Sequence, residues 1–335
     1  MRAWSRPSFV LLALAFAGAC GTATATPDER LDAGAATSGV TGTATTTTTG
    51  PTSTSSSSSG VGGSDGGGGV WSGPIGGERP VEVVVPPGYD PAKPAPLLLL
   101  LHGYVAGGGL QEVYLDLEPE AAARGYLFAQ PFGTTDKTGL PFWNATDACC
   151  NFYGSTVDDS AYLAMVIAQI RQAYSVDPTR IFLVGHSNGG FMTHRMACEH
   201  ADVIASIATL AGSTWDDPSK CQPSEPVSAL VLHGTLDPVI HYGGGQLFGN
   251  SYPGAVETAE SWAKLDGCGA SGIVSPTKLD LIGTFLAETT VTWWPSCAPG
   301  IDVEHWRIEA GTHVLLFKDE WKKRLFDFFD AHPKP

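Results

Sequence analysis

Between residues 81 and 331 the chain alternates short apolar runs with longer amphipathic segments. The apolar runs predict strands, and the amphipathic segments predict helices. The expected strands are Val81–Val85, Pro96–Leu101, Tyr126–Gln130, Arg180–Val184, Val203–Leu210, Val227–His233 and Val303–Ile308. The expected helices are Leu110–Arg124, Asp158–Tyr174, Gly190–His200, Ala255–Leu265 and Asp319–Ala331. Strands that alternate with helices predict an α/β fold with a doubly wound, mostly parallel sheet.

Two of these strand segments are apolar at every position, namely Leu97–Leu101 and Ile181–Val184. Continuous apolar runs are typical of strands that helices cover on both faces. The acidic pair Asp158 and Asp159 stands at the start of an expected helix. An acid there caps the helix and interacts favourably with its dipole, so we expect a structural role for the pair.

The segment Gly185-His186-Ser187-Asn188-Gly189 lies between an expected strand and an expected helix. A G-x-S-x-G sequence in this context is typical of a nucleophile elbow. Its glycines allow a turn so tight that the serine adopts a strained backbone conformation and presents its hydroxyl. We therefore expect Ser187 to be a nucleophile and the amide of Asn188 to be an oxyanion donor.

A serine nucleophile requires a base and an acid that orients it, and after an elbow the acid precedes the histidine in the chain. Asp237 follows the expected strand Val227–His233, and His313 follows Val303–Ile308. Loops after parallel strands meet at one edge of the sheet, so Ser187, Asp237 and His313 are the predicted triad. The competing residues are His241 and His305 as bases and Asp216, Asp217 and Asp266 as acids.

A second oxyanion donor is expected from the loop after an earlier strand. His102-Gly103-Tyr104 follows Pro96–Leu101, and Gly103 allows the backbone to approach the substrate closely. The amide of Tyr104 is the predicted second donor. His102 is expected to be a structural imidazole that hydrogen-bonds to the backbone of its loop.

The N-terminal segment, residues 1–20, resembles an export signal. Arg2 and Arg6 precede the apolar stretch Phe9–Ala17, which is too short to span a bilayer. Ala17-Gly18-Ala19-Cys20 resembles a bacterial lipobox, although Ala17 stands where leucine is usual. We expect lipidation of Cys20 and anchoring to a bacterial membrane or cell surface. The alternative is ordinary cleavage and secretion of a soluble protein.

Residues 21–75 form a linker rich in serine, threonine and glycine. Such a segment has too little apolar surface to fold and is expected to be a disordered tether. Residues 76–335 are expected to form one catalytic domain with a minimal lid or none. The sequence does not indicate the oligomeric state.

The net charge of −15 argues against nucleic-acid binding. The histidines and cysteines lack the spacing of metal ligands, so no metal site is expected. If Cys20 is lipidated, six of the seven cysteines remain, an even number that favours disulfides in an exported protein. Proximity in the sequence suggests two pairs, Cys198 with Cys221 and Cys268 with Cys297. The adjacent Cys149 and Cys150 either bridge each other or stay unpaired.

From about Arg79 to Phe329 the chain resembles the extracellular esterase family of polyhydroxybutyrate depolymerases, feruloyl esterases and acetylxylan esterases. The resemblance rests on Leu100–Gly103, Trp143-Asn144 through Cys149-Cys150, Val157–Asp159, Asp177–Arg180, Gly185–Gly190, Leu232–Val239 and Gly311–His313. It implies an α/β-hydrolase fold, no cofactor, and a triad made of Ser187, Asp237 and His313.

The expected function is an exported serine esterase that cleaves feruloyl or acetyl esters of plant polysaccharide through an acyl-enzyme. The alternative substrate is a polyhydroxyalkanoate. A serine peptidase and a non-catalytic binding protein on the same scaffold are less favoured. Aromatic residues on expected loops, Trp143, Tyr153 and Trp215, are candidates for contact with a polymeric ester. The only membrane contact expected is the lipid anchor.

Overall fold

The computed structural model of the protein describes residues 73–284 and 286–335. The expected signal peptide, Cys20 and residues 21–72 of the expected linker lie outside the described residues. Within the described part of the chain, no helix is long and apolar enough to cross a membrane.

A nine-stranded sheet forms the centre of the described chain. Its strands are β1 (Val83–Val84), β2 (Ala95–Leu101), β3 (Leu127–Ala129), β6 (Val176–His186), β7 (Ser206–Leu210), β8 (Ser228–Gly234), β11 (Ile273–Val274), β12 (Thr289–Trp293) and β13 (Val303–Ile308). Their spatial order is β1-β3-β2-β6-β7-β8-β13-β12-β11. The six strands from β3 to β13 in this order are parallel, and β1, β12 and β11 are antiparallel to their neighbours. The predicted mostly parallel sheet is confirmed.

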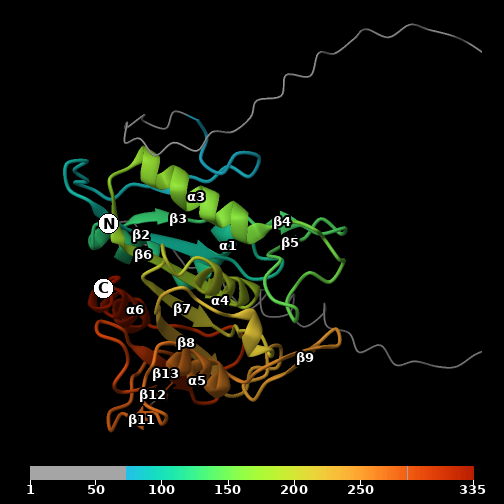
Figure 1. Ribbon diagram of the computed structural model, residues 1–335. Coiled ribbons are helices and arrows are strands. Elements are labelled where there is room, and N and C mark those ends of the chain that lie inside the picture. The colour runs from blue at the N-terminus through green and yellow to red at the C-terminus, as the bar shows by residue number, and fades with distance from the viewer. Residues whose placement is uncertain (1–72, 285) are drawn as a thin grey trace, which may run out of the picture. The chain divides into compact units, whose positions relative to one another are not determined.

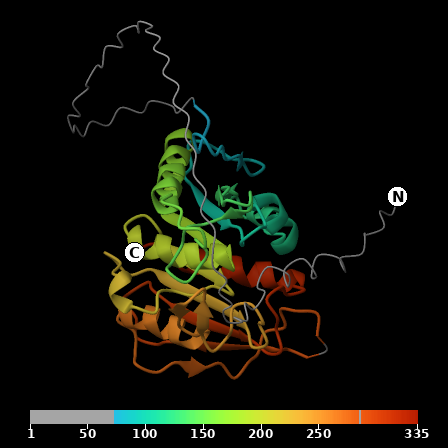
Figure 2. The ribbon, with the colours of Figure 1, turned by 90° about the vertical axis from the view of Figure 1, so that its right-hand side faces the viewer.

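Helices cover both faces of this sheet. They are α1 (Gly108–Leu115), α2 (Glu118–Ala123), α3 (Asp159–Ala173), α4 (Asn188–Glu199), α5 (Ala255–Leu265) and α6 (Asp319–Ala331). Buried residues of α3, α4 and α5 belong to one core, and those of α1, α2 and α6 belong to another. In Figure 1 the helices α3 and α4 lie in front of the strands, and Figure 2 shows α3 and the teal α1–α2 segment on opposite sides of them.

The strand β2 explains why its sequence is apolar throughout. Leu97, Leu99 and Leu101 pack into the core beneath α3 and α4, whereas Leu98 and Leu100 pack into the core on the opposite face. All five side chains are completely buried. Because successive strand residues point to opposite faces, a strand between two helical layers must be apolar at every position.

Several predicted elements differ from the structure in their extent, among them β6, which begins at Val176 rather than at Arg180. The expected helix Leu110–Arg124 is two helices. Asp116 has a left-handed backbone (φ 53°) that ends α1, and α2 begins at Glu118 with Pro119 in its first turn. The expected strand at Val203–Leu210 begins only at Ser206, since the chain before it leaves α4 through a turn.

Several short strands have no counterpart in the prediction. They are the edge strands β11 and β12 and two small hairpins, β4 (Thr134–Thr135) with β5 (Pro141–Phe142) and β9 (Gly245–Leu247) with β10 (Asn250–Tyr252). Most are only two or three residues long, which is too short for a period of two to be visible. The antiparallel β12 places β13 inside the sheet rather than at its edge.

Three disulfides join the six cysteines of the described chain. Cys198 is bonded to Cys221 and Cys268 to Cys297, which are the two pairs that proximity in the sequence suggests. Cys149 is bonded to Cys150, so the structure adopts the vicinal bridge that the sequence left open.

Asp266, one of the competing acids, has a buried carboxyl that takes no part in the triad. Its Oδ1 accepts a hydrogen bond from the amide of Val227 at 3.1 Å, and its Oδ2 has no partner among the described residues. Burial raises the pKa of Asp266 to about 7. The folded state therefore favours the protonated carboxyl, and this contribution to stability is lost as the pH rises through about 7.

Asp266→Asn should remove this loss, because the amide keeps an oxygen acceptor for Val227 and carries no charge. As the pH rises from 5 to 8, the wild type should lose about 3 kcal/mol more of its unfolding free energy than the variant does. Urea unfolding at the two pH values measures the shift. A difference between variant and wild type that is the same at both pH values would contradict the assignment.

Candidate active site

The predicted nucleophile lies on a strained turn between β6 and α4. Ser187 has φ 55° and ψ −121°, a conformation that non-glycine residues rarely adopt. A Cβ added to Gly185 would lie 2.2 Å from the carbonyl oxygen of Gly189, and one added to Gly189 would lie 2.1 Å from that of Leu101. Both glycines are therefore required by close packing, and the turn holds Ser187 at the carboxyl end of the parallel strands.

The structure brings the three predicted triad residues together. The Nε2 atom of His313 is 3.0 Å from the hydroxyl oxygen of Ser187, and its Nδ1 is 2.8 Å from Oδ2 of Asp237. The side chains are almost completely buried. Because the carboxylate can only accept, Nδ1 of His313 carries the proton and donates it, which leaves Nε2 to accept from the serine hydroxyl.

Asp237 is held as a charged carboxylate by several donors. Its Oδ1 accepts hydrogen bonds from the amides of Val239 at 2.8 Å and Ile240 at 3.0 Å. Burial alone would raise the pKa of Asp237, but hydrogen bonds from the imidazoles of His233 and His313 outweigh it and hold this pKa well below its usual range. His233 Nε2 lies 3.4 Å from Oδ2, and sequence reasoning had given it no role.

The loops that carry Asp237 and His313 are packed directly against each other. Gly234 and Gly311 meet so closely that a Cβ on Gly234 would lie 2.4 Å from the carbonyl oxygen of Gly311. The amide of Leu236 donates to that same oxygen at 2.8 Å. The acid and the base therefore keep their separation through backbone contacts as well as through their own hydrogen bond.

His186, the residue before the nucleophile, supports the backbone of His313. Its Nε2 donates to the backbone carbonyl of His313 at 2.9 Å, and the two ring centroids are 4.9 Å apart. Burial lowers the pKa of His186 to about 3, so this imidazole is neutral near pH 7. The elbow pattern carries no signal for this role, because it leaves the position of His186 unspecified.

The loop after β2 lies against the nucleophile, as predicted. A Cβ on Gly103 would be 3.4 Å from the Cβ of Ser187, which places the neighbouring Tyr104 beside the reaction centre. The amide of Gly103 donates to the side-chain oxygen of Gln111, a buried residue of α1 that sequence reasoning missed, at 2.9 Å. On the elbow side, Asn188 is the first residue of α4, where amides have no partner within the helix.

His102 has the structural role expected of it. Its Nδ1 donates to the carbonyl of Gly103 at 2.8 Å, and its Nε2 accepts from the amide of Gly133 at 2.9 Å. Burial lowers the pKa of His102 to about 4, which is consistent with this neutral tautomer.

Comparison with known proteins identifies the fold. Residues 142–223 match the family described as PGAP1-like alpha/beta domain. The chain resembles the solved structure of an acetyl xylan esterase from Aspergillus awamori with a TM-score of 0.54 and 14% sequence identity, over 77% of this chain and 96% of that one. The chain has the α/β-hydrolase fold. The predicted fold class is therefore confirmed.

Similar sequences carry esterase names. The chain is 32% identical to feruloyl esterase B of Piromyces equi over 198 residues, which is 57% of this chain and 36% of that protein. It is 25% identical to a bifunctional acetylxylan esterase/xylanase of Neocallimastix patriciarum over 244 residues, 71% of this chain and 31% of that protein. The chain thus spans about a third of the length of these two relatives. The resemblance to feruloyl and acetylxylan esterases is confirmed.

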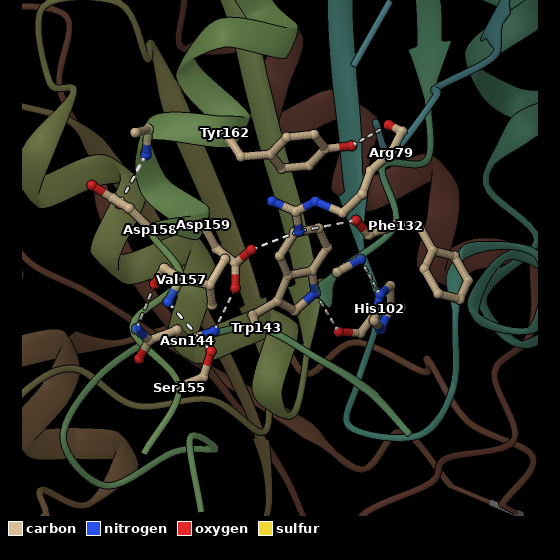
Figure 3. A network of polar contacts seen from close by, with 12 residues as sticks. Arg79, His102, Phe132, Trp143, Asn144, Ser155, Val157, Asp158, Asp159 and Tyr162 are labelled. Carbon is tan, nitrogen blue, oxygen red and sulfur yellow. Dashed lines mark hydrogen bonds and ion pairs between the residues drawn. The ribbon is translucent and has the colours of Figure 1, made fainter. Parts of the chain in front are cut away.

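The expectation that Trp143 contacts substrate is wrong, because this side chain is completely buried in the α/β-hydrolase core. Its indole nitrogen donates to the carbonyl of His102 at 3.0 Å (Figure 3). Its amide donates to Oδ1 of Asn188 at 2.7 Å, and its carbonyl accepts from Nδ2 of Asn188 at 2.9 Å. Trp143 therefore joins the two segments that carry the predicted oxyanion donors.

The buried carboxylate of Asp159 holds the chain segment that follows Trp143. Asp159, at the start of α3, accepts from the amide of Asn144 at 2.7 Å and from the guanidinium of Arg79 at 2.6 Å. The guanidinium carbon of Arg79 lies 3.5 Å from the ring centroid of Tyr162. Figure 3 shows this network beside the indole. Asp158 caps α3 by accepting from an amide at 3.0 Å, so the acidic pair has the structural role that was predicted.

Trp143→Phe should reduce kcat by about tenfold with little change in KM, because loss of the indole bond frees one donor segment relative to the other. Trp262→Phe is a matched control, since Trp262 is also buried and its indole donates to His194 at 2.9 Å. Steady-state kinetics and thermal unfolding of both variants test the role. Equal effects on kcat would show that Trp143 acts through stability alone.

Three other candidates for acid and base, His305, Asp216 and Asp217, have partners outside the triad. His305 is buried in β13, where its Nδ1 donates to the carbonyl of Val231 at 2.9 Å. Asp216 accepts from the hydroxyl of Ser251 at 2.5 Å, on the surface. Asp217 caps a short 3₁₀ turn at residues 218–220. Within residues 73–284 and 286–335, no three His, Cys, Asp or Glu side chains are grouped as metal ligands.

Proposed function

We propose that the protein is a serine carboxylester hydrolase that is exported and cleaves feruloyl or acetyl esters of plant polysaccharide. The observation that carries this proposal is the hydrogen-bonded path from Asp237 through His313 to Ser187, which ends on a strained nucleophile elbow. This geometry suits acyl transfer to a serine oxygen.

In the proposed mechanism, the hydroxyl of Ser187 attacks the ester carbonyl while Nε2 of His313 takes its proton. Asp237 keeps the imidazole in the required tautomer and stabilises its charged form. The amides of Asn188 and Tyr104 stabilise the tetrahedral oxyanion. His313 then protonates the leaving alcohol, and a water molecule cleaves the acyl-enzyme with the same histidine as base.

Aromatic side chains beside the proposed oxyanion loop favour an aromatic acyl group. The rings of Tyr104 and Phe152 meet edge to face with their centroids 5.4 Å apart. The ring centroids of Phe152 and Phe248 are 4.2 Å apart. Phe248 is 69% exposed, so this row continues to the surface. Aromatic faces of this kind suit a planar ferulate ring. The names of the similar feruloyl and acetylxylan esterases support the same substrate class.

A second candidate substrate is a polyhydroxyalkanoate. Leu236, next to the acid, is 63% exposed, and Leu316, three residues after the base, is 77% exposed. Exposed apolar side chains near the acid and the base suit an apolar polymer surface. The further proposal of export rests on the N-terminal sequence, with Cys20 as the site of lipidation, and mass spectrometry of the mature N-terminus tests it.

Turnover of p-nitrophenyl acetate tests the esterase activity, and an initial burst of p-nitrophenol would reveal the acyl-enzyme. Parallel assays with methyl ferulate, acetylated xylan and polyhydroxybutyrate then identify the substrate class. Release of ferulate or acetate without release of hydroxybutyrate is the expected result. A protein that hydrolyses none of these esters would contradict the proposed function.

A further inference from the structure

Two cavities share Trp215, a residue of the loop after β7, in their lining. The larger has a volume of about 480 Å³ and the smaller about 190 Å³. The larger lies within the range of small-molecule sites, which is about 300–1,000 Å³. Asn144, Arg195 and Glu199 line the larger cavity. The smaller one is lined by Asp216, Asp217, Asn250 and Ser251, and Thr146 and Asp147 contribute to both.

The charges in the larger cavity are paired with each other. Nε of Arg195 is 2.9 Å from a carboxylate oxygen of Glu199, and Lys220 forms an ion pair with Asp147. The cavity therefore offers no excess charge of either sign to attract an ion. It offers fixed donors and acceptors side by side, which suits a neutral ligand with several hydroxyl groups.

Thr146 lines both cavities and carries an unpaired polar group. Its side chain is only 5% exposed, and its hydroxyl oxygen has no hydrogen-bond partner within the described residues. Buried polar groups are normally paired, so an unpaired hydroxyl is unusual in a residue that lines a cavity.

Trp215 adds a partly exposed aromatic ring to these polar walls. The electron-rich face of an indole attracts the polarised C–H groups of a sugar ring, while the surrounding side chains bond its hydroxyls. A polyester has ester carbonyls but no hydroxyl groups along its chain, so it cannot use the donors and acceptors of these walls in the same way.

The cavities lie within reach of the proposed nucleophile. Arg195 is eight residues along α4 from Ser187, a separation of about 12 Å at 1.5 Å per residue. Asn144 follows Trp143, which is bonded to Asn188 beside the nucleophile, and Arg195 donates to the carbonyl of Asn144 at 2.7 Å. A polymer with its ester at Ser187 has a few units in which to reach Trp215.

We propose that Trp215 and the two cavities beside it form a subsite for a neutral sugar unit of the polysaccharide that carries the ester. This inference rests on the proposed function and extends it, because it selects a glycan over a polyester as the polymer.

Kinetics of Trp215→Ala test the subsite. The loss in kcat/KM should be at least about fivefold greater for a feruloylated arabinoxylan oligosaccharide than for p-nitrophenyl acetate, and it should arise in KM. Trp293→Ala is the control, because Trp293 is an exposed tryptophan on β12, near one edge of the sheet and three strands away from β7. This variant should change kcat/KM for neither substrate. An equal loss for both substrates, or a greater loss for a hydroxybutyrate oligomer, would overturn the inference.

Direct binding separates this inference from the proposed function. Calorimetric titration of the Ser187→Ala variant with unesterified xylo-oligosaccharide should show binding that Trp215→Ala weakens by about fivefold or more. Asp147→Asn should weaken it as well, through loss of a charged acceptor. Absence of binding would refute the subsite even if the wild type hydrolyses esters. Binding by a protein without esterase activity would refute the function and keep the sugar site.

Discussion

Ser187→Ala should reduce ester hydrolysis by about 10⁴-fold or more while leaving the fold intact. The substitution removes only the hydroxyl group, and this group hydrogen-bonds to Nε2 of His313. Alanine can keep the backbone of the elbow, because the strained φ of 55° is imposed by the packing around Gly185 and Gly189. Hydrolysis of p-nitrophenyl acetate, measured on protein with a wild-type thermal transition, gives the result.

Ser213→Ala is the control for this prediction. Ser213 is also a buried serine after a sheet strand, but its hydroxyl donates to the carbonyl of Pro253 at 2.8 Å rather than to a histidine. We expect this variant to change stability and to keep the activity. Substantial hydrolysis by Ser187→Ala, in a preparation free of contaminating esterase, would exclude Ser187 as the nucleophile.

Asp237→Asn should reduce kcat by about 10⁴-fold through the tautomer of His313. The asparagine oxygen can still accept from the amides of Val239 and Ile240, so its amide nitrogen replaces the Oδ2 that faces His313. That nitrogen is a donor, so Nδ1 of His313 must become the acceptor and Nε2 the protonated atom. A protonated Nε2 cannot take the proton of Ser187.

The control is Asp266→Asn, which makes the same chemical change at a buried acid outside the triad. It should retain activity within about twofold, because the carboxyl of Asp266 has no hydrogen-bond partner other than the amide of Val227 among the described residues. Comparison of kcat for the two variants near pH 7 tests the assignment. Similar activities would mean that the acid of the triad lies elsewhere.

Sequence patterns predicted the regular strands and helices of the fold and the tight turn at the nucleophile. The continuously apolar β2 indicates a strand that helices cover on both faces, since such a strand allows few polar residues. The glycines of the elbow indicate a close turn, since such a turn allows few side chains. The order of Ser187, Asp237 and His313, each after a strand, then sufficed to place three distant residues at one edge of the sheet.

The contacts that support the site were not predictable in the same way. Gln111 and His186 lie in segments whose pattern specifies only helix or turn, and their partners are distant in sequence. Trp143 was misread, because an aromatic residue on an expected loop looks the same whether it faces substrate or the core. Only the tertiary fold shows that its indole reaches His102 and its backbone meets Asn188.

The pairing of Asn188 with Trp143 also bears on how long the protein stays chemically intact. Asn188 precedes Gly189, and in a flexible chain the glycine nitrogen readily attacks an asparagine side chain to form a succinimide. In the folded state the side-chain amide of Asn188 is completely buried and bonded at both ends to Trp143, within the first turn of α4. Deamidation at this position therefore requires unfolding, and it would place a new carboxylate beside the nucleophile. Each unfolding event thus carries a risk of permanent inactivation, so the useful life of the protein in storage is set by its unfolding rate.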